Sequence, residues 1–193
     1  IVAHIDAGKT TLTERILFDT GAQSWVGSVD EGTAAMDFMP AERSRGISIT
    51  SAATRAAWGD HVMQVVDTPG HVDFVAEVER CLRVIDGAVV LVDGVRGVES
   101  QTRAVWAQAV SAGLPRLVFV NKLDRAGAAF RAVVDEVAEQ LDCTAVAVTV
   151  PLRDASGQFS GLGDAVTGAV QWFEGRPEAE QIPELQRALR TAH

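Results

Sequence analysis

The sequence predicts an α/β fold built on a doubly wound, mostly parallel β-sheet. Strand-like apolar segments alternate with segments of helical periodicity over most of the chain. The run Ala88–Val92 is apolar without alternation, which is typical of a strand whose two faces are both covered by helices. The pair Gly59-Asp60 joins two other strand-like segments and predicts a two-residue hairpin turn. We therefore expect a sheet that is parallel apart from this hairpin.

The order of the elements follows from these periodicities. The expected helices cover residues 8–18, 72–85, 99–112 and 127–141, and those over 72–85 and 127–141 place apolar residues on one face. The expected strands cover residues 47–58, 61–67, 88–92, 117–120 and 144–150. A further strand is expected to end at Ala3. The expected strands over residues 61–67, 88–92 and 117–120 are each followed by an expected helix, as βαβ units require.

Two segments depart from this alternation. Residues 21–46 are rich in Gly, Ser and acidic residues and have no sustained periodicity, which is typical of a functional or disordered segment. After Pro151 the sequence becomes glycine-rich, so we expect one domain over residues 1–150 and the beginning of another over 151–193. Because the chain starts without Met, inside an expected strand, we expect it to be part of a longer protein.

Composition limits the functional classes. The formal net charge is −9, which argues against nucleic-acid binding through bulk charge but leaves room for RNA contact by a few placed residues. No apolar run reaches the about 18 residues of a membrane span. Cys81 and Cys143 lack the spacing of metal ligands and are expected to be buried, reduced thiols. We expect a soluble, cytoplasmic and monomeric protein that does not contact a membrane.

Basic residues are used unevenly. The chain has 15 Arg but two Lys, a single Asn and no Tyr. Lys9 falls inside the first of the motifs described below, and Asn121 and Lys122 fall inside the third. Since Lys and Arg are not interchangeable in a tight loop, this distribution indicates a chemical requirement at both places.

The first motif is a phosphate-binding loop between a strand and a helix. It reads Ala3-His4-Ile5-Asp6-Ala7-Gly8-Lys9-Thr10 and is followed by Thr11. The backbone amides of residues 6–11 (Asp6, Ala7, Gly8, Lys9, Thr10 and Thr11) are expected to bind phosphate at the helix N-terminus. Lys9 is expected to neutralise phosphate oxygens and Thr10 to coordinate Mg²⁺. His4 is expected to be a structural loop residue. Ala3 replaces the usual first glycine, so another class of phosphate loop stays open on this motif alone.

The second motif, Asp67-Thr68-Pro69-Gly70-His71, follows an apolar strand. Asp67 is placed to hold Mg²⁺ through water, and the Gly70 amide to meet the γ-phosphate. His71 would then lie beside the attacking water. The alternative is that His71 only caps the helix expected over residues 72–85.

The third motif, Asn121-Lys122-Leu123-Asp124, also follows a strand. The Asp124 carboxylate can accept hydrogen bonds from the N1 and N2 groups of guanine, which adenine does not offer. The Lys122 stem would cover the base and Asn121 would brace the loop. A fourth element, Arg45-Gly46-Ile47-Ser48, offers the Ser48 hydroxyl to Mg²⁺ as part of a γ-phosphate-dependent switch. Ser48 could instead be an ordinary polar strand residue.

Together these segments resemble elongation factor G, and the resemblance covers nearly all of residues 1–172. The segments that carry it are Ala-His-Ile-Asp-Ala-Gly-Lys-Thr-Thr, Arg-Gly-Ile-Ser-Ile-Thr, Asp-Thr-Pro-Gly-His-Val-Asp-Phe and Asn-Lys-Leu-Asp-Arg. The resemblance implies a fold of the P-loop GTPase type with the beginning of an inserted α/β subdomain. It implies GTP and GDP as ligands, Mg²⁺ as cofactor and the ribosome as partner. His71 corresponds to the family's catalytic histidine, which ribosomal RNA of the large subunit positions, and Ile5 and Ile47 correspond to its apolar gate.

The resemblance also has departures. Ser48 replaces the switch threonine and lacks its methyl group. In this family the Ser-Ala loop that contacts guanine comes after the inserted subdomain, so residues 1–193 alone are expected to bind nucleotide weakly.

Several functions stay open. The leading hypothesis is ribosome-stimulated GTP hydrolysis that drives translocation of tRNA and mRNA. Ribosome-recycling and tetracycline-protection relatives share every motif above. A GTP-dependent binding switch without hydrolysis is the alternative of another class. A phosphate-loop kinase would leave Asn121, Lys122 and Asp124 without a role.

Overall fold

A computed structural model of the chain describes residues 1–27, 52–68, 75–154 and 156–173. These residues divide into two compact units. The first unit comprises Ile1–Asp93 and Glu99–Asn121, and the second comprises Gly94–Val98 and Lys122–His193. Each unit is described by itself below.

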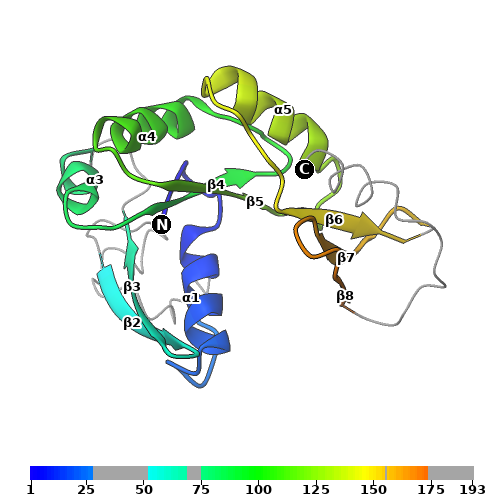
Figure 1. Ribbon diagram of the computed structural model, residues 1–193, viewed down its shortest axis with the longest axis horizontal. Coiled ribbons are helices and arrows are strands. Elements are labelled where there is room, and N and C mark those ends of the chain that lie inside the picture. The colour runs from blue at the N-terminus through cyan, green and yellow to red at the C-terminus, as the bar shows by residue number, and fades with distance from the viewer. Residues whose placement is uncertain (28–51, 69–74, 155, 174–193) are drawn as a thin grey trace. The chain divides into compact units, whose positions relative to one another are not determined.

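The first unit contains a parallel sheet with the strand order β1-β4-β5 (Figure 1). Its strands are β1 (Val2–Ala3), β4 (Ala88–Asp93) and β5 (Arg116–Asn121). Val90, Leu91 and Val92 of β4 are almost fully buried, as their unbroken apolar run predicts. In the register of β4 and β5, Asp93 lies opposite Asn121, so two polar residues end neighbouring strands at the same edge.

The first unit also contains an antiparallel hairpin, which forms a two-stranded sheet of its own. It consists of β2 (Ala52–Trp58) and β3 (His61–Asp67), and Trp58 pairs with His61 across the two-residue turn that Gly59-Asp60 predicts. The Ile1 nitrogen donates to the Val66 carbonyl at 2.6 Å, and the Ile1 carbonyl accepts from the Thr68 amide at 3.4 Å. These two bonds flank Asp67 and hold the end of β3 beside Ile1, the residue that precedes β1.

Among the residues that the structure describes, the first unit contains the helices α1 (Lys9–Asp19), α3 (Val75–Leu82) and α4 (Ser100–Ser111). Leu91 of β4 forms a core cluster with Ala3 and Ala7, and Leu12 of α1 packs against it. On α4, Trp106 is buried, and the Arg116 guanidinium lies 4.8 Å from the centre of its ring. The buried face of α4 thus mixes Val105, Trp106 and Ala109 with polar residues, and the buried face of α1 is mostly polar.

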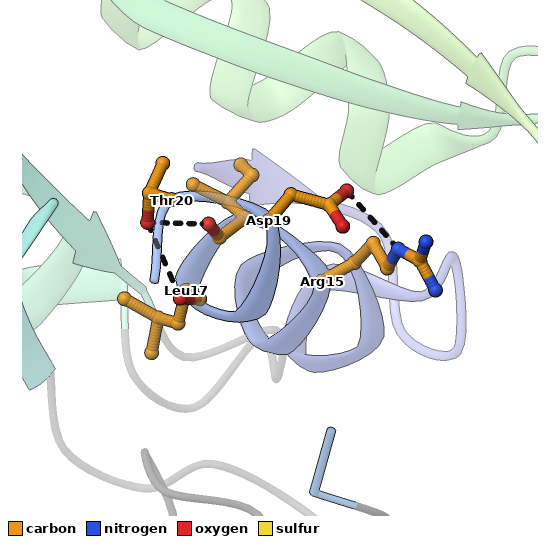
Figure 2. Close-up of polar contacts among 5 residues, drawn as sticks. Arg15, Leu17, Asp19 and Thr20 are labelled. Atoms are coloured by element: carbon orange, nitrogen blue, oxygen red, sulfur yellow. Dashed lines mark hydrogen bonds and ion pairs between the residues drawn. The ribbon is translucent and has the colours of Figure 1, made fainter. Parts of the chain in front are cut away.

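The C-terminal end of α1 is held by local polar contacts (Figure 2). The Thr20 hydroxyl donates to the carbonyl of Ile16 at 2.7 Å and to that of Leu17 at 3.2 Å. Arg15 and Asp19, one turn apart, form an exposed ion pair at 3.0 Å. The helix thus ends where a hydroxyl satisfies its last carbonyl groups.

The second unit contains α5 (Phe130–Gln140) and a three-stranded antiparallel sheet. Its strands, in the order β6-β7-β8, are β6 (Thr149–Arg153), β7 (Phe159–Asp164) and β8 (Val170–Trp172). Val150 and Leu152 form its core, against which Phe130 and Trp172 pack. Gly161 lies directly opposite Trp172, and a Cβ atom there would come within 2.6 Å of the indole.

The predicted fold class is confirmed, with two corrections. The last predicted strand begins later than residue 144: residues 144–148 are outside any strand, and β6 pairs antiparallel with β7 instead of joining the parallel sheet. Cys81 and Cys143 are free thiols but half-buried instead of buried. The predicted domain boundary at residue 151 falls within β6 and stays a prediction. Residues 47–51 of the first predicted hairpin strand lie outside the described part of the chain.

Candidate phosphate-binding site

The loop between β1 and α1 is shaped by two left-handed residues. Asp6 has φ 60° and Gly8 has φ 97°. Gly8 is the N-cap residue of α1, and its carbonyl accepts the first helical bond, from the Leu12 amide at 2.9 Å. The amides at the start of α1 therefore face the loop, where the helix dipole favours an anion.

Asn121, the last residue of β5, holds this loop from the side. Its amide nitrogen donates to the Ala7 carbonyl at 2.9 Å. The same nitrogen would lie 2.5 Å from a Cβ atom on Gly8. Gly8 is thus required twice, for its backbone conformation and for the close approach of Asn121.

Lys9 is the charged centre of the loop. Its side chain is 8% exposed. Burial lowers the pKa of Lys9, while the carboxylates of Asp67 and Asp6 act in the opposite direction. A buried ammonium at a helix N-terminus is stabilised by an anionic ligand, so the site fits a phosphate group.

Asp67 completes the described part of this site. It is the last residue of β3, is 2% exposed and lies near enough to Lys9 to act on its pKa. The next residue, Thr68, donates from its hydroxyl to the Ile1 carbonyl at 2.9 Å, which fixes the end of β3 beside β1. A buried carboxylate close to a phosphate-binding loop fits a divalent cation that also contacts phosphate.

Contacts that the motifs do not indicate support the loop from α4. The Ile5 amide donates to Gln101 Oε1 at 3.2 Å, and His4 Nε2 lies 3.2 Å from Glu99 Oε1. His4 thus contacts the residue that precedes α4, and its expected role as a structural loop residue stays a prediction. Glu99 and Gln101 lie at the start of α4, and no spacing in the sequence links them to residues 4 and 5.

Glu14 is a second residue that the motifs do not indicate. It is fully buried on α1, and its Oε2 accepts from Gln23 Nε2 at 2.6 Å and from the Gly27 amide at 2.9 Å. The carboxylate thereby ties the chain that follows α1 back to the helix. No apolar periodicity marks Glu14, because the buried face of α1 that it shares with Leu17 also contains Lys9 and Thr13.

The second unit carries Lys122, Leu123 and Asp124. Leu123 is buried and Asp124 is exposed. Lys122 has φ 60°, and its carbonyl accepts from the Arg125 amide at 3.1 Å, so the backbone turns sharply here. This turn presents the Asp124 carboxylate to solvent beside a buried anchor.

The remaining predicted site residues divide into two groups. Thr10 is half-buried and Thr11 exposed in the first turn of α1. Ser48, Gly70, His71 and the gate residue Ile47 lie outside the residues that the structure describes. The structure brings together Asp6, Ala7, Gly8, Lys9, Asp67 and Asn121 around one loop.

Comparisons with known proteins identify the family. Residues 1–186 match the family described as the elongation factor Tu GTP binding domain. Among curated relatives, ribosome-releasing factor 2, mitochondrial, of Yarrowia lipolytica is 52% identical over 91% of this chain and 22% of its own length. Elongation factor G of Wolbachia pipientis is 51% identical over 90% of this chain and 25% of its own length.

A solved structure has the same fold. A crystal structure of a protein from Thermus thermophilus has a TM-score of 0.89 and 32% identity, and the match covers 98% of this chain and 29% of that one. This chain thus spans about a quarter of the length of the curated relatives it matches. In the described residues, no helix is long and apolar enough to cross a membrane. The resemblance that the motifs indicate is confirmed, and the chain belongs to the elongation factor Tu GTP-binding domain family, as a GTPase domain of the elongation factor G type.

Proposed function

We propose that the complete protein hydrolyses GTP on the ribosome and uses the hydrolysis to translocate tRNA and mRNA during elongation. The observation that carries this proposal is the buried Lys9 at the N-terminus of α1, framed by Asn121 and Asp67. That arrangement supports the binding of a nucleotide phosphate chain, and the relative named elongation factor G supports the ribosomal role.

The phosphate chain is bound by the backbone amides of Asp6, Ala7, Gly8, Lys9, Thr10 and Thr11 in this proposal. The Lys9 ammonium neutralises phosphate oxygens, and the phosphates in turn compensate its burial. Mg²⁺ would be held by the hydroxyls of Thr10 and Ser48 and, through water, by Asp67, and it would supply charge neutralisation. Every one of these groups acts by placement, because phosphoryl transfer depends on positioning and electrostatics.

Guanine is selected by Asp124. Its exposed carboxylate accepts from N1 and N2 of the base, Lys122 covers the base face, and Asn121 supports the phosphate loop through Ala7. An adenine ring would leave the carboxylate without donors, which costs several kcal/mol by order of magnitude.

Hydrolysis is assigned to His71 and Gly70. The Gly70 amide contacts the γ-phosphate, and His71 orients the attacking water once ribosomal RNA of the large subunit fixes its side chain. Without the ribosome, turnover is slow because this last positioning step is missing. We also propose that residues 1–150 form the GTPase domain, that residues 151–193 begin the inserted subdomain, and that the protein acts as a cytoplasmic monomer.

One other function has specific support. The relative named ribosome-releasing factor 2, mitochondrial, is as similar to this chain as the elongation factor, so ribosome recycling is the second candidate. Ribosome protection is a third candidate of the same family, and a GTP-dependent switch without hydrolysis is one of another class.

The test uses the complete protein with GTP on ribosomes that hold tRNAs in the pre-translocation state. Movement of mRNA by one codon per round, lost in His71→Ala while GDP binding persists, is the result expected. Ribosome-stimulated hydrolysis without movement would favour recycling or protection. Codon movement and unchanged hydrolysis in His71→Ala would refute the catalytic assignment, and binding without any hydrolysis would favour the switch.

A further inference from the structure

Arg153 joins two loops of the second unit with one side chain. It is the last residue of β6, and its Nη1 donates to the Gly157 carbonyl at 2.8 Å. Its Nη2 donates to the Ala128 carbonyl, 25 residues earlier in the chain, at 3.2 Å. The planar guanidinium therefore links the turn between β6 and β7 to the loop that precedes α5.

Several hydrogen bonds join Asp154 to residues 156–158, which include the residue that receives Nη1. Asp154 Oδ1 accepts from the Ser156 amide at 2.9 Å, the Ser156 hydroxyl at 2.6 Å and the Gln158 amide at 2.9 Å. Two backbone bonds of 2.9 Å, from Gly157 to Asp154 and from Asp154 to Gln158, close the turn. The Ser156 hydroxyl and the neighbouring amides lower the pKa of Asp154, so the carboxylate keeps its charge at neutral pH. The Gly157 carbonyl is thereby fixed for Arg153.

The loop that receives Nη2 leads directly to the base-recognition motif. The Ala128 amide donates to the Arg125 carbonyl at 3.1 Å, and the Arg125 amide donates to the Lys122 carbonyl at 3.1 Å. The Ala129 amide donates to the Gly94 carbonyl at 2.9 Å. A chain of two successive turns thus connects the Arg153 contact to Lys122, and a displacement at Ala128 is passed on through backbone bonds.

We propose that Arg153 is a positioning residue for the guanine-selective loop, and that it couples the β6–β7 hairpin to base recognition. This inference rests on the proposed role of Asp124 in binding guanine. The two hydrogen bonds from guanine N1 and N2 require both carboxylate oxygens in the right orientation, whereas hypoxanthine lacks the N2 amino group. Loss of the hydrogen bonds of Arg153 therefore weakens the binding of GDP more than the binding of IDP.

The experiment measures the dissociation constants of GDP and IDP for the complete protein and for Arg153→Ala. The matched control is Arg131→Ala, because Arg131 is an exposed arginine of the same unit whose ion pair, with Asp135 at 3.5 Å, is local to α5. Arg153→Ala is expected to weaken GDP binding by about threefold to tenfold, which is the contribution of one ordinary hydrogen bond. It is expected to leave IDP nearly unchanged, so that the preference for GDP falls, while Arg131→Ala alters neither constant.

The outcomes separate this inference from the proposed function. A wild-type protein without preference for GDP over IDP would refute the role of Asp124. The wild-type protein can instead show a clear preference for GDP. In that case, the role of Arg153 alone is overturned if Arg153→Ala keeps this preference or weakens the binding of GDP and IDP equally.

A double-mutant cycle tests the coupling through the hairpin. Asp154→Ala removes the carboxylate that fixes the turn, so it is expected to lower the GDP preference in the same direction. If both residues act through the Gly157 carbonyl, the GDP preference of the double variant falls by a smaller factor than the product of the two single-variant factors. Independent, multiplicative losses would show that Arg153 does not act through the turn and would overturn the coupling.

Discussion

The side-chain amide of Asn121 donates a 2.9 Å hydrogen bond to the carbonyl oxygen of Ala7, 114 residues earlier in the chain. Asn121 ends β5, and Ala7 lies in the loop that opens α1. The strand end that leads into the base-recognition motif therefore supports the phosphate loop directly. This contact explains why the chain keeps its one asparagine at this position.

Asn121→Ala is expected to weaken GDP binding to the complete protein. The substitution leaves the buried Ala7 carbonyl without its donor, which costs about 1–3 kcal/mol, and a loss of about fivefold or more in affinity follows. Calorimetric titration with GDP measures it. Gln171→Ala, at an exposed amide of β8, serves as the control and should bind like wild type. An unchanged GDP affinity in Asn121→Ala would show that the contact between Asn121 and Ala7 does not support nucleotide binding.

Gly8→Ala is expected to abolish high-affinity nucleotide binding. A Cβ atom at this position would lie 2.5 Å from Asn121 Nδ2, in addition to the strain of φ 97°. Gly21→Ala isolates the strain, because Gly21 has φ 69° but no atom within 4 Å of its would-be Cβ. Both variants are expected to lose about 1 kcal/mol of stability from the backbone. If fluorescent GDP dissociates equally fast from the two variants, the close approach of Asn121 to Gly8 does not contribute to nucleotide binding.

Lys9→Met is expected to stabilise the nucleotide-free protein in a pH-dependent way. Burial lowers the pKa of Lys9 below 10.5, so between the lowered pKa and 10.5 the unfolded chain binds more protons than the folded one. Wild-type stability therefore rises with pH through that window, and the advantage of the neutral Met shrinks there. Urea denaturation of both proteins from neutral pH upward measures this difference. A constant difference would contradict the lowered pKa.

Glu14→Ala is expected to lower the free energy of unfolding by about 2 kcal/mol, because two donors, Gln23 Nε2 and the Gly27 amide, lose their buried acceptor. Glu14→Gln keeps an acceptor oxygen and is expected to lose less. Glu139→Ala, at an exposed carboxylate of α5, is the control. Denaturant unfolding measures the free energy of unfolding of each variant. Equal stabilities of Glu14→Ala and Glu139→Ala would argue against the buried contact.

Short-range patterns predicted the parallel sheet and the placement of its polar residues. The unbroken run in β4 required two covered faces, and the polar residues that end β3 and β5, Asp67 and Asn121, marked the edge where the loop lies. These inferences succeed because strand geometry and helix dipoles act locally. The phosphate loop needed only Gly8 and Lys9 in the right order after a strand.

Long-range pairing was harder to predict. The alternation in residues 144–150 indicated a strand but not its partner, and β6 instead pairs with β7, whose interior Gly161 weakens any strand signal. The contacts of Glu14 and Gln101 join segments that no periodicity relates. Such contacts depend on which segments meet in the fold, which a single sequence does not specify.

The tryptophans are distributed so that each unit has its own optical reporter. Trp106 is buried in the first unit beneath Arg116, and Trp172 packs against the core of the second, whereas Trp25 and Trp58 are 60% and 62% exposed. Replacing the two exposed indoles by Phe would leave one tryptophan fluorophore in each unit. Removing either of the remaining two would then show by emission whether the units melt in one cooperative transition or one after the other.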